Sequence, residues 1–298
     1  MMKQCIKKAI MSLLVIGLII GMSQPTLAVQ EDSKVGETIV VYGDALSADQ
    51  KEQTRRLLEV MNPNKVKEYT VTGQDIAKYI GGDPNSNMYS SAKITRQEEG
   101  KGLTINIVTA DNITEVTNEM YANALLTAGV ENATVDVASP VQVTGTSALS
   151  GIYKAYDEEG AELDKERMEL ASEELDVATE LSDKEGMDEG KVSELLAEIK
   201  KEIADQNPAT KEDVERIVKE QLDKLEISLS EEDRQLLINL FEKMRDLNID
   251  FDKVKNQLND IAAKVKEEFG DILEDESFWK KVEDFFIGII NFFKNLFT

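Results

Sequence analysis

The spacing of apolar residues changes character partway along the chain. Between residues 29 and 156, short β-branched runs such as TIVVY at residues 38–42 alternate with segments whose apolar positions recur at helical spacing. This alternation is typical of a domain that mixes strands and helices. After residue 162 the apolar positions follow a helical period throughout. We therefore predict an α+β or α/β amino-terminal domain followed by an all-α helical domain.

The first domain should hold several short strands between capped helices. The capping-box sequence that begins at Ser47 predicts a helix to about Met61. A later helix should begin at Thr114 and stop at Gly129, because glycine commonly ends helices. The glycine-rich segment 98–102 separates two of the strands and predicts a β-hairpin. The expected strands are residues 38–42, 66–71, 92–96, 103–109, 134–137 and 141–144.

Four apolar stripes at helical spacing predict four helices in the second half. Asn207-Pro208 separates the first two stripes, and polar residues at 228–230 and 248–250 mark the later breaks. The charged residues between the stripes are most simply a solvated face, so we interpret this part as a helical bundle or a set of extended hairpins. The stripes run through residues 195–203, 214–225, 236–247 and 251–269.

The amino terminus has the three parts of a secretory signal peptide. Three lysines within residues 3–8 precede an uncharged stretch at residues 9–22, and a polar segment then ends at Ala28. The apolar part is shorter than the roughly 20 residues that cross a bilayer comfortably as a helix. Cleavage after Ala28 is therefore expected, with an uncleaved anchor as the alternative. In either case the rest of the chain should be exported, either extracellular or associated with the cell envelope.

The carboxyl terminus predicts an amphipathic helix rich in aromatic residues. When residues 277–298 are arranged as a helix, one side is apolar and the other is polar and nearly neutral. Such a helix would lie on a membrane surface or in the apolar groove of a partner, with aromatic burial as the driving force. Alternatively, it packs on the preceding helices. The apolar face consists of Phe278, Trp279, Val282, Phe285, Phe286, Ile289, Ile290, Phe292, Phe293, Leu296 and Phe297.

Composition excludes several kinds of chemistry. The chain has no histidine, and its one cysteine, Cys5, precedes the expected cleavage site. Mechanisms that need Ser-His-Asp or Cys-His are therefore excluded, and the commonest zinc ligand is missing. We expect no cofactor. With 34 basic and 58 acidic residues, the net charge is −24, so nucleic acid is not an expected partner.

The acidic charge is concentrated in the second half. Residues 29–156 carry 17 acidic and 11 basic side chains, whereas residues 157–298 carry 41 and 20. This step coincides with the change to helical spacing, so we expect two independently folding domains. The complete division is a signal peptide at 1–28, an α/β domain at 29–156, an acidic helical domain at 157–276 and the amphipathic terminal helix at 277–298.

Two short patterns resemble ligand or catalytic sites. Gly145, Thr146 and Ser147 open a helix whose free N–H groups could receive an anion, although a capped helix without a ligand explains them as well. Ser90 and Lys93 have the spacing of a serine nucleophile and its lysine base, but the following β-branched residues favour a strand, which would point them to opposite faces.

A third pattern resembles the start of a calcium-binding loop. Asp246, Asn248, Asp250 and Asp252 occupy alternate positions. The complete pattern requires glycine at the sixth position and glutamate at the twelfth, and the sixth is occupied by Phe251. The twelfth position is occupied by Gln257. A loop that caps a helix is the simpler interpretation.

Separated blocks of the sequence resemble one family. The blocks are SSAKIT at residues 90–95, MYANALLTAGVENATVDVASPVQVTGTSALSGIYKAY at 120–156 and LFEKMRDLNIDFDKVKNQL at 240–258. Together they resemble the YpuA-like family of exported proteins of Gram-positive bacteria, whose function is unknown. The resemblance covers most of residues 35–265. It implies an envelope or extracellular setting and supplies no catalytic residues.

These observations favour a binding or structural role over catalysis. We expect an exported, envelope-associated protein whose partner is an envelope component or another protein, with a membrane surface as a further partner for the terminal helix. The alternative is a carboxylate-dependent hydrolase that acts on cell-wall glycan or peptide, because such an enzyme needs only two acidic residues. A cleft with paired carboxylates would favour the hydrolase, and a flat or apolar groove would favour the binding protein.

The signal-peptide pattern gives the first testable prediction. Cells that express the gene should release a chain that begins at Val29, because the small residues Thr26 and Ala28 precede the cleavage site. Amino-terminal sequencing of the released protein checks this. Recovery of the protein only in the membrane fraction, with Met1 retained, would contradict it.

Overall fold

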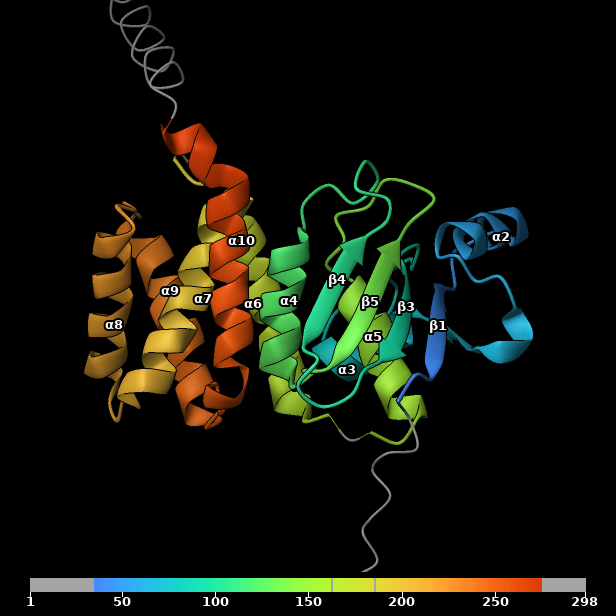
Figure 1. The fold of residues 1–298 in the computed structure, drawn as a ribbon, viewed down its shortest axis with the longest axis horizontal. Coiled ribbons are helices and arrows are strands. Elements are labelled where there is room, and N and C mark those ends of the chain that lie inside the picture. Colours follow the sequence, from blue (N-terminus) through green and yellow to red (C-terminus); the bar gives the residue numbers. More distant parts are fainter. Residues whose placement is uncertain (1–34, 162, 185, 275–298) are drawn as a thin grey trace, which may run out of the picture. The chain divides into compact units, whose positions relative to one another are not determined.

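The computed structural model describes residues 35–161, 163–184 and 186–274 (Figure 1). Two of the sequence predictions, the signal peptide at 1–28 and the aromatic helix at 277–298, lie outside these residues. The described residues from Gly36 onward belong to one compact unit. They form a mixed sheet with helices in the first half and helices alone in the second half, which confirms the predicted fold class.

Within the described residues, the sheet has five strands in the order β2-β1-β3-β5-β4. The outer pairs β1–β2 and β4–β5 are parallel, whereas β3 in the middle runs antiparallel to both of its neighbours. The strands are β1 (Thr38–Gly43), β2 (Lys67–Val71), β3 (Ser91–Arg96), β4 (Leu103–Ile107) and β5 (Ala133–Ala138).

The predicted β-hairpin between β3 and β4 is wrong. β5 lies between these strands, so that Ile94 and Ile105 are both register partners of Val135. The turn itself is present, since Gly100 and Gly102 have positive φ angles. A turn determines only that the chain reverses, and a strand from elsewhere in the sequence can still insert between the two arms.

Two further boundaries differ from the sequence prediction. Residues 141–144 form no strand, and only Val143 makes an isolated bridge, to Ile113. Helix α4 (Asn118–Ala128) begins later than expected, because Thr117 rather than Thr114 caps it and accepts a hydrogen bond from the Met120 amide. The Thr114 hydroxyl instead donates to the carbonyl of Val143.

The other helices begin and end largely where the stripes and caps predict, although residues 165–182 form a helix that none of the four predicted stripes covers. Ser47 forms the expected capping box at the start of α2, and Gly129 ends α4 in the left-handed conformation. Thr210 caps the helix that follows Asn207-Pro208. These helices are α2 (Ala48–Leu57), α3 (Gly73–Ile80), α5 (Ala148–Glu158), α6 (Lys165–Ser182), α7 (Glu189–Gln206), α8 (Lys211–Lys224), α9 (Glu231–Asp246) and α10 (Lys255–Glu274), with short 3-10 turns η2 (Pro63–Lys65) and η3 (Asp252–Val254).

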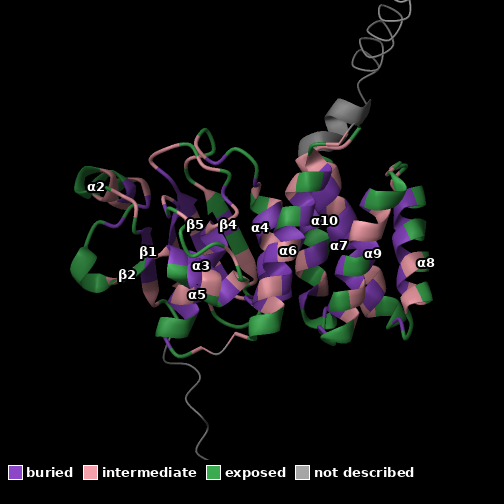
Figure 2. Cartoon of the chain, turned by 180° about the vertical axis from the view of Figure 1, so that it is seen from behind, coloured by how far each residue is buried: buried purple, intermediate pink, exposed green. Residues whose placement is uncertain are grey.

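The main hydrophobic core continues across the composition boundary at residue 157. One cluster of buried side chains includes Val135 in the sheet, Leu125 in α4, Leu175 in α6 and Leu196 in α7. Helix α4 packs against both α6 and α7, and Figure 2 shows buried residues along all three helices. The charge step therefore does not coincide with a gap in the core. The division into two independently folding domains stays a prediction.

A buried polar network lies where α4, α6 and α7 meet. Nζ of Lys200 lies 2.5 Å from a carboxylate oxygen of Glu174, and both side chains are almost completely buried, at 0% and 1% exposure. The same ammonium donates to the backbone carbonyl of Asn123 at 2.9 Å, and the Thr127 hydroxyl donates to Glu174 at 2.6 Å. Burial lowers the pKa of Lys200 below its ordinary value.

Removal of one partner of this pair should destabilise the fold strongly. Lys200→Met leaves the Glu174 carboxylate buried without its counter-ion, so we expect the free energy of unfolding to fall by about 3–5 kcal/mol. Urea denaturation followed by circular dichroism measures the loss. Lys219→Met is the control, because Lys219 forms an exposed pair with Asp223 and should leave the stability nearly unchanged. Equal stability of the two variants would contradict the prediction.

Candidate binding groove

β4 lies at one edge of the sheet, so one side of its backbone has no neighbouring strand. N–H groups alternate in direction along a strand, and the amide of Val108 donates to the carbonyl of Val137 on the side of β5. The backbone N–H and C=O groups of Leu103, Ile105 and Ile107 therefore point away from the sheet. An exposed row of this kind can pair with another extended chain.

Two side-chain amides cover the ends of this row. The Leu103 amide donates to Oε1 of Gln257 on α10 at 2.7 Å, and the Ile107 amide donates to Oδ1 of Asn118 on α4 at 2.9 Å. Gln257 is itself held, because its Nε2 donates to the carbonyl of Glu131 at 3.2 Å. Between these two ends, the outward N–H and C=O groups of Ile105 have no partner among the described residues.

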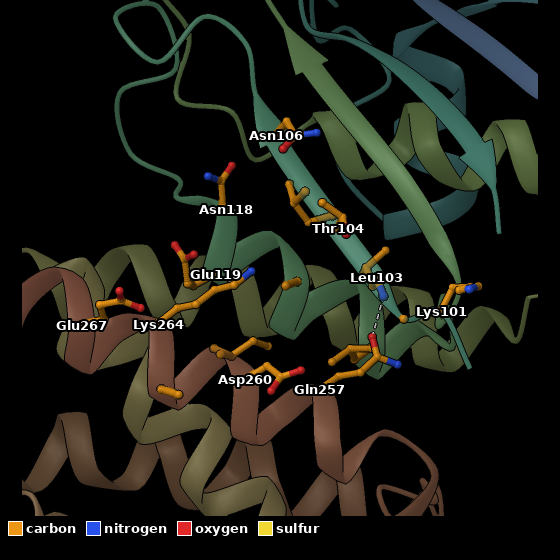
Figure 3. Close-up of a pocket in the computed structure, with 16 residues that line it drawn as sticks. Lys101, Leu103, Thr104, Asn106, Asn118, Glu119, Gln257, Asp260, Lys264 and Glu267 are labelled. Atoms are coloured by element: carbon orange, nitrogen blue, oxygen red, sulfur yellow. Dashed lines mark hydrogen bonds between the residues drawn. The ribbon is translucent and has the colours of Figure 1, made fainter. Parts of the chain in front are cut away.

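The open part of the β4 edge forms one wall of a groove. Helices α4 and α10 form the other walls, and the cavity has a volume of about 580 Å³ (Figure 3). Its apolar lining includes Ala122 and Leu126 from α4 and Ile261 and Ala263 from α10. This volume lies within the range of small-molecule and cofactor sites. We call this site the edge groove.

Five charged side chains line the edge groove without forming ion pairs. Lys101 precedes β4, Glu119 belongs to α4, and the others belong to α10. Glu119 and Lys264 project into the space between the two helices (Figure 3). Within the described part of the chain, none of the five makes a side-chain hydrogen bond or ion pair, so their charges are available to a ligand. The five are Lys101, Glu119, Asp260, Lys264 and Glu267.

The predicted anion site lies outside this groove. Ser147 precedes α5, but its side chain makes no capping hydrogen bond. The Gly145 carbonyl accepts a hydrogen bond from the Tyr121 hydroxyl at 2.6 Å, and Gly145 itself has a positive φ angle of 106°. A side chain there would also collide with Ile113, so glycine is required. Anion binding by Gly145, Thr146 and Ser147 stays a prediction.

The calcium-like residues form the connection between α9 and η3. Asp246 pairs with Arg245, and Oδ1 of Asp250 accepts from the amide of Asp252 at 3.2 Å. Asn248 adopts the left-handed conformation just after α9. Among the described residues, no group of three or more acidic, cysteine or histidine side chains is placed to hold a metal ion. Calcium binding by Asp246, Asn248, Asp250 and Asp252 stays a prediction, as does their role in capping a helix.

Ser90 and Lys93 do not form a catalytic pair. Lys93 lies within β3, where its ammonium is 2.8 Å from the Asp136 carboxylate and donates to the Leu58 carbonyl at 2.7 Å. Ser90 directly precedes the strand, and residues three apart on an extended chain point to opposite faces. The strand expected from the sequence is thus confirmed at this position.

The sequence did not reveal the edge groove. In the sequence, Gln257 stands where a calcium loop requires glutamate, and Asn118 matches no site pattern. Both are polar residues at the starts of helices, where local sequence suggests a solvent-exposed position. Their contacts with β4 join residues that are far apart in the chain, so no local pattern marks them. None of the described helices is long and apolar enough to cross a membrane.

The fold and groove define an α/β protein with an attached helical half and a ligand-sized groove between the two. The chain belongs to the family described as "Protein of unknown function (DUF1002)", whose model matches residues 42–261. It is also similar to the "Uncharacterized protein YpuA" of Bacillus subtilis (strain 168), with 36% identity over 208 residues, covering 67% of this chain and 69% of the relative. The predicted family is thereby confirmed. No solved structure gives a significant match.

Loss of the Gln257 side chain should weaken the attachment of α10 to β4. Gln257→Ala removes two hydrogen bonds and leaves the Leu103 amide without its acceptor, so we expect a loss of about 1–3 kcal/mol in the free energy of unfolding. Asn256→Ala changes an exposed neighbour on the same helix and is the control. Urea denaturation compares the two variants. A Gln257→Ala variant as stable as the control would show that this contact does not hold the edge.

Proposed function

We propose that this protein is an exported, envelope-associated binding protein that holds a short extended peptide along the free edge of β4. The observation that carries the proposal is the unpartnered backbone of Ile105 inside the edge groove. A peptide that lies beside β4 would donate to and accept from this residue, as in other cases where a peptide adds a strand to a sheet. Apolar side chains of the peptide would contact Ala122 and Ile261.

The covered ends of the edge limit the length of the ligand. From Leu103 to Ile107 a strand extends about 13 Å, because each residue advances it by about 3.3 Å. Gln257 and Asn118 occupy the outward amides at these two positions. The open section thus suits a segment of about three or four residues rather than a long strand.

The charges of the groove suit a ligand with both signs of charge. Lys101 and Lys264 can attract a carboxylate, whereas Glu119, Asp260 and Glu267 can attract an amine. A short peptide carries both groups at its ends or on its side chains. Peptides that bear free amines and carboxylates fit this mixed set better than a purely anionic or apolar ligand.

The export expected from the sequence supports an envelope setting for this activity. The basic, apolar and small-residue parts of residues 1–28 are those of a secretory signal. A protein outside the cytoplasm meets peptides of the envelope. The aromatic segment 277–298 would add a second attachment, either to a membrane surface or to a partner protein.

A groove-filling substitution tests the proposal. Ala263→Trp should occupy the edge groove and reduce the affinity for tetrapeptides at least tenfold, because Ala263 lines the cavity and is exposed. Asn259→Trp is the matched control on the same helix, since Asn259 is exposed but lies outside the lining. Calorimetric titration with a set of tetrapeptides that carry free termini measures the affinity.

Three outcomes decide the matter. Binding by the control and not by Ala263→Trp supports the proposal. Equal affinity of both variants, or the absence of binding by the unchanged protein, contradicts it. Cleavage of a peptide or wall glycan during the titration, lost in Glu119→Gln or Asp260→Asn, would instead favour the carboxylate-dependent hydrolase.

A further inference from the structure

The buried network contains a lysine amine that contacts both an acid and a side-chain amide. Lys200 and Asn123 are fully buried, and Glu174 is 1% exposed. Their positions come from three helices, α7, α4 and α6, so the contact depends on the folded state. The Phe251 ring centroid lies 5.8 Å from the Lys200 Nζ and adds to the apolar surroundings. Such isolation from water favours reactions between neutral groups and suppresses hydrolysis.

The geometry brings the amine to the carboxamide of Asn123. Nζ of Lys200 lies 3.4 Å from Oδ1 of Asn123. The carbonyl carbon Cγ is bonded to that oxygen, so the distance from Nζ to Cγ differs from this value by no more than the length of one C=O bond. Nδ2 of the same amide donates to the Ser193 carbonyl at 3.1 Å, which fixes the orientation of the group. Folding alone thereby holds a nucleophile beside an acyl carbon, which is the arrangement that accelerates intramolecular reactions.

We propose that Lys200 and Asn123 form an intramolecular isopeptide bond, with Glu174 as the proton carrier. Glu174 takes a proton from the Lys200 ammonium across their 2.5 Å contact, and the neutral amine attacks Cγ of Asn123. A C–N bond forms between Nζ and Cγ. The bond between Cγ and Nδ2 breaks, and a second proton moves from Nζ to Nδ2 as ammonia leaves. The products are a secondary amide, ammonia and a protonated Glu174, so that atoms and charge balance.

Electrostatics favour formation of the amide over persistence of the ion pair. Two opposite charges in a dry interior retain much of their desolvation cost, and the reaction replaces them with a neutral amide and a neutral acid. Burial already lowers the pKa of Lys200, which favours the neutral amine that the attack requires. The Thr127 hydroxyl, which donates to Glu174 at 2.6 Å, keeps that carboxyl in place beside Lys200.

The bond would connect α4 to α7 covalently. It would close a loop of 77 residues between the sheet half and the helical half of the chain. A cross-link stabilises a fold mainly by restricting the unfolded chain, and a long loop gives a large effect. In a chain without disulfides after residue 28, such a bond would supply the covalent constraint that exported proteins often obtain from cysteines.

Mass spectrometry of the purified, full-length folded protein tests the bond. The intact mass should be lower by one ammonia molecule than the mass calculated from the sequence of the chain that is purified, counted from its observed amino terminus. After denaturation and complete trypsin digestion, residues 102–154 should appear joined to residues 192–201, because a modified Lys200 resists cleavage whereas Lys201 does not. An unmodified intact mass, together with separate fragments that end at Lys154 and Lys200, would overturn the proposal.

Substitutions identify the reacting groups. Asn123→Ala keeps the Lys200–Glu174 pair but removes the acyl carbon, so it should show the full sequence mass and normal cleavage after Lys200. Glu174→Gln should do the same, with circular dichroism to confirm that the variant folds. A joined fragment pair in Asn123→Ala, or full cross-linking in a folded Glu174→Gln protein, would contradict the assignment. Mass spectrometry of the unchanged protein decides the question on its own. A variant that fails to fold therefore does not affect the test.

Discussion

The contact between Lys200 and Glu174 is the constraint on which the arrangement of the helices depends. While the folded chain holds them as an ion pair, two opposite charges without access to water are tolerable only when each is paired and its remaining hydrogen-bonding capacity is used. Asn123 and Thr127 meet that need from α4, while the ion pair itself joins α7 to α6. The requirement fixes three helices together and leaves little freedom for them to slide.

The edge groove follows from that constraint through two further contacts. Helix α7 packs extensively on α10, so its position determines where α10 lies beside the sheet. Helix α10 then brings Gln257 to the Leu103 amide, while α4 supplies Asn118 to the Ile107 amide. The edge of β4 is thus closed at both ends by residues from different halves of the chain. Only a short section of the edge remains open, at Ile105. A whole strand edge left open would promote aggregation.

Sequence patterns predict helices and strands well where the pattern repeats along the chain. They predict contacts poorly where the two partners are far apart in the sequence. The apolar stripes in α7 to α10 are sufficient to predict these helices, because a helix buries one face whatever its neighbour is. By contrast, Lys200 lies beside Lys201 in a charged helix, and this local sequence predicts a solvent-exposed side chain. Its partner Glu174 is 26 residues away, so no local pattern reveals the contact. The predicted hairpin between β3 and β4 is wrong for a related reason, because β5, which inserts between these strands, follows β4 after 25 intervening residues. Turn chemistry and helix caps are local, whereas strand order and buried charge pairs are not.

Backbone amide hydrogen exchange in the folded protein tests most directly whether the helical half closes the sheet edge everywhere except at Ile105. NMR can follow the amides of Leu103, Ile105 and Ile107 separately. We expect slow exchange at Leu103 and Ile107, whose amides donate to Gln257 and Asn118, and rapid exchange at Ile105 between them. Equally rapid exchange at all three would show that α4 and α10 do not hold the edge. Equally slow exchange would show that no section of it is open to a ligand.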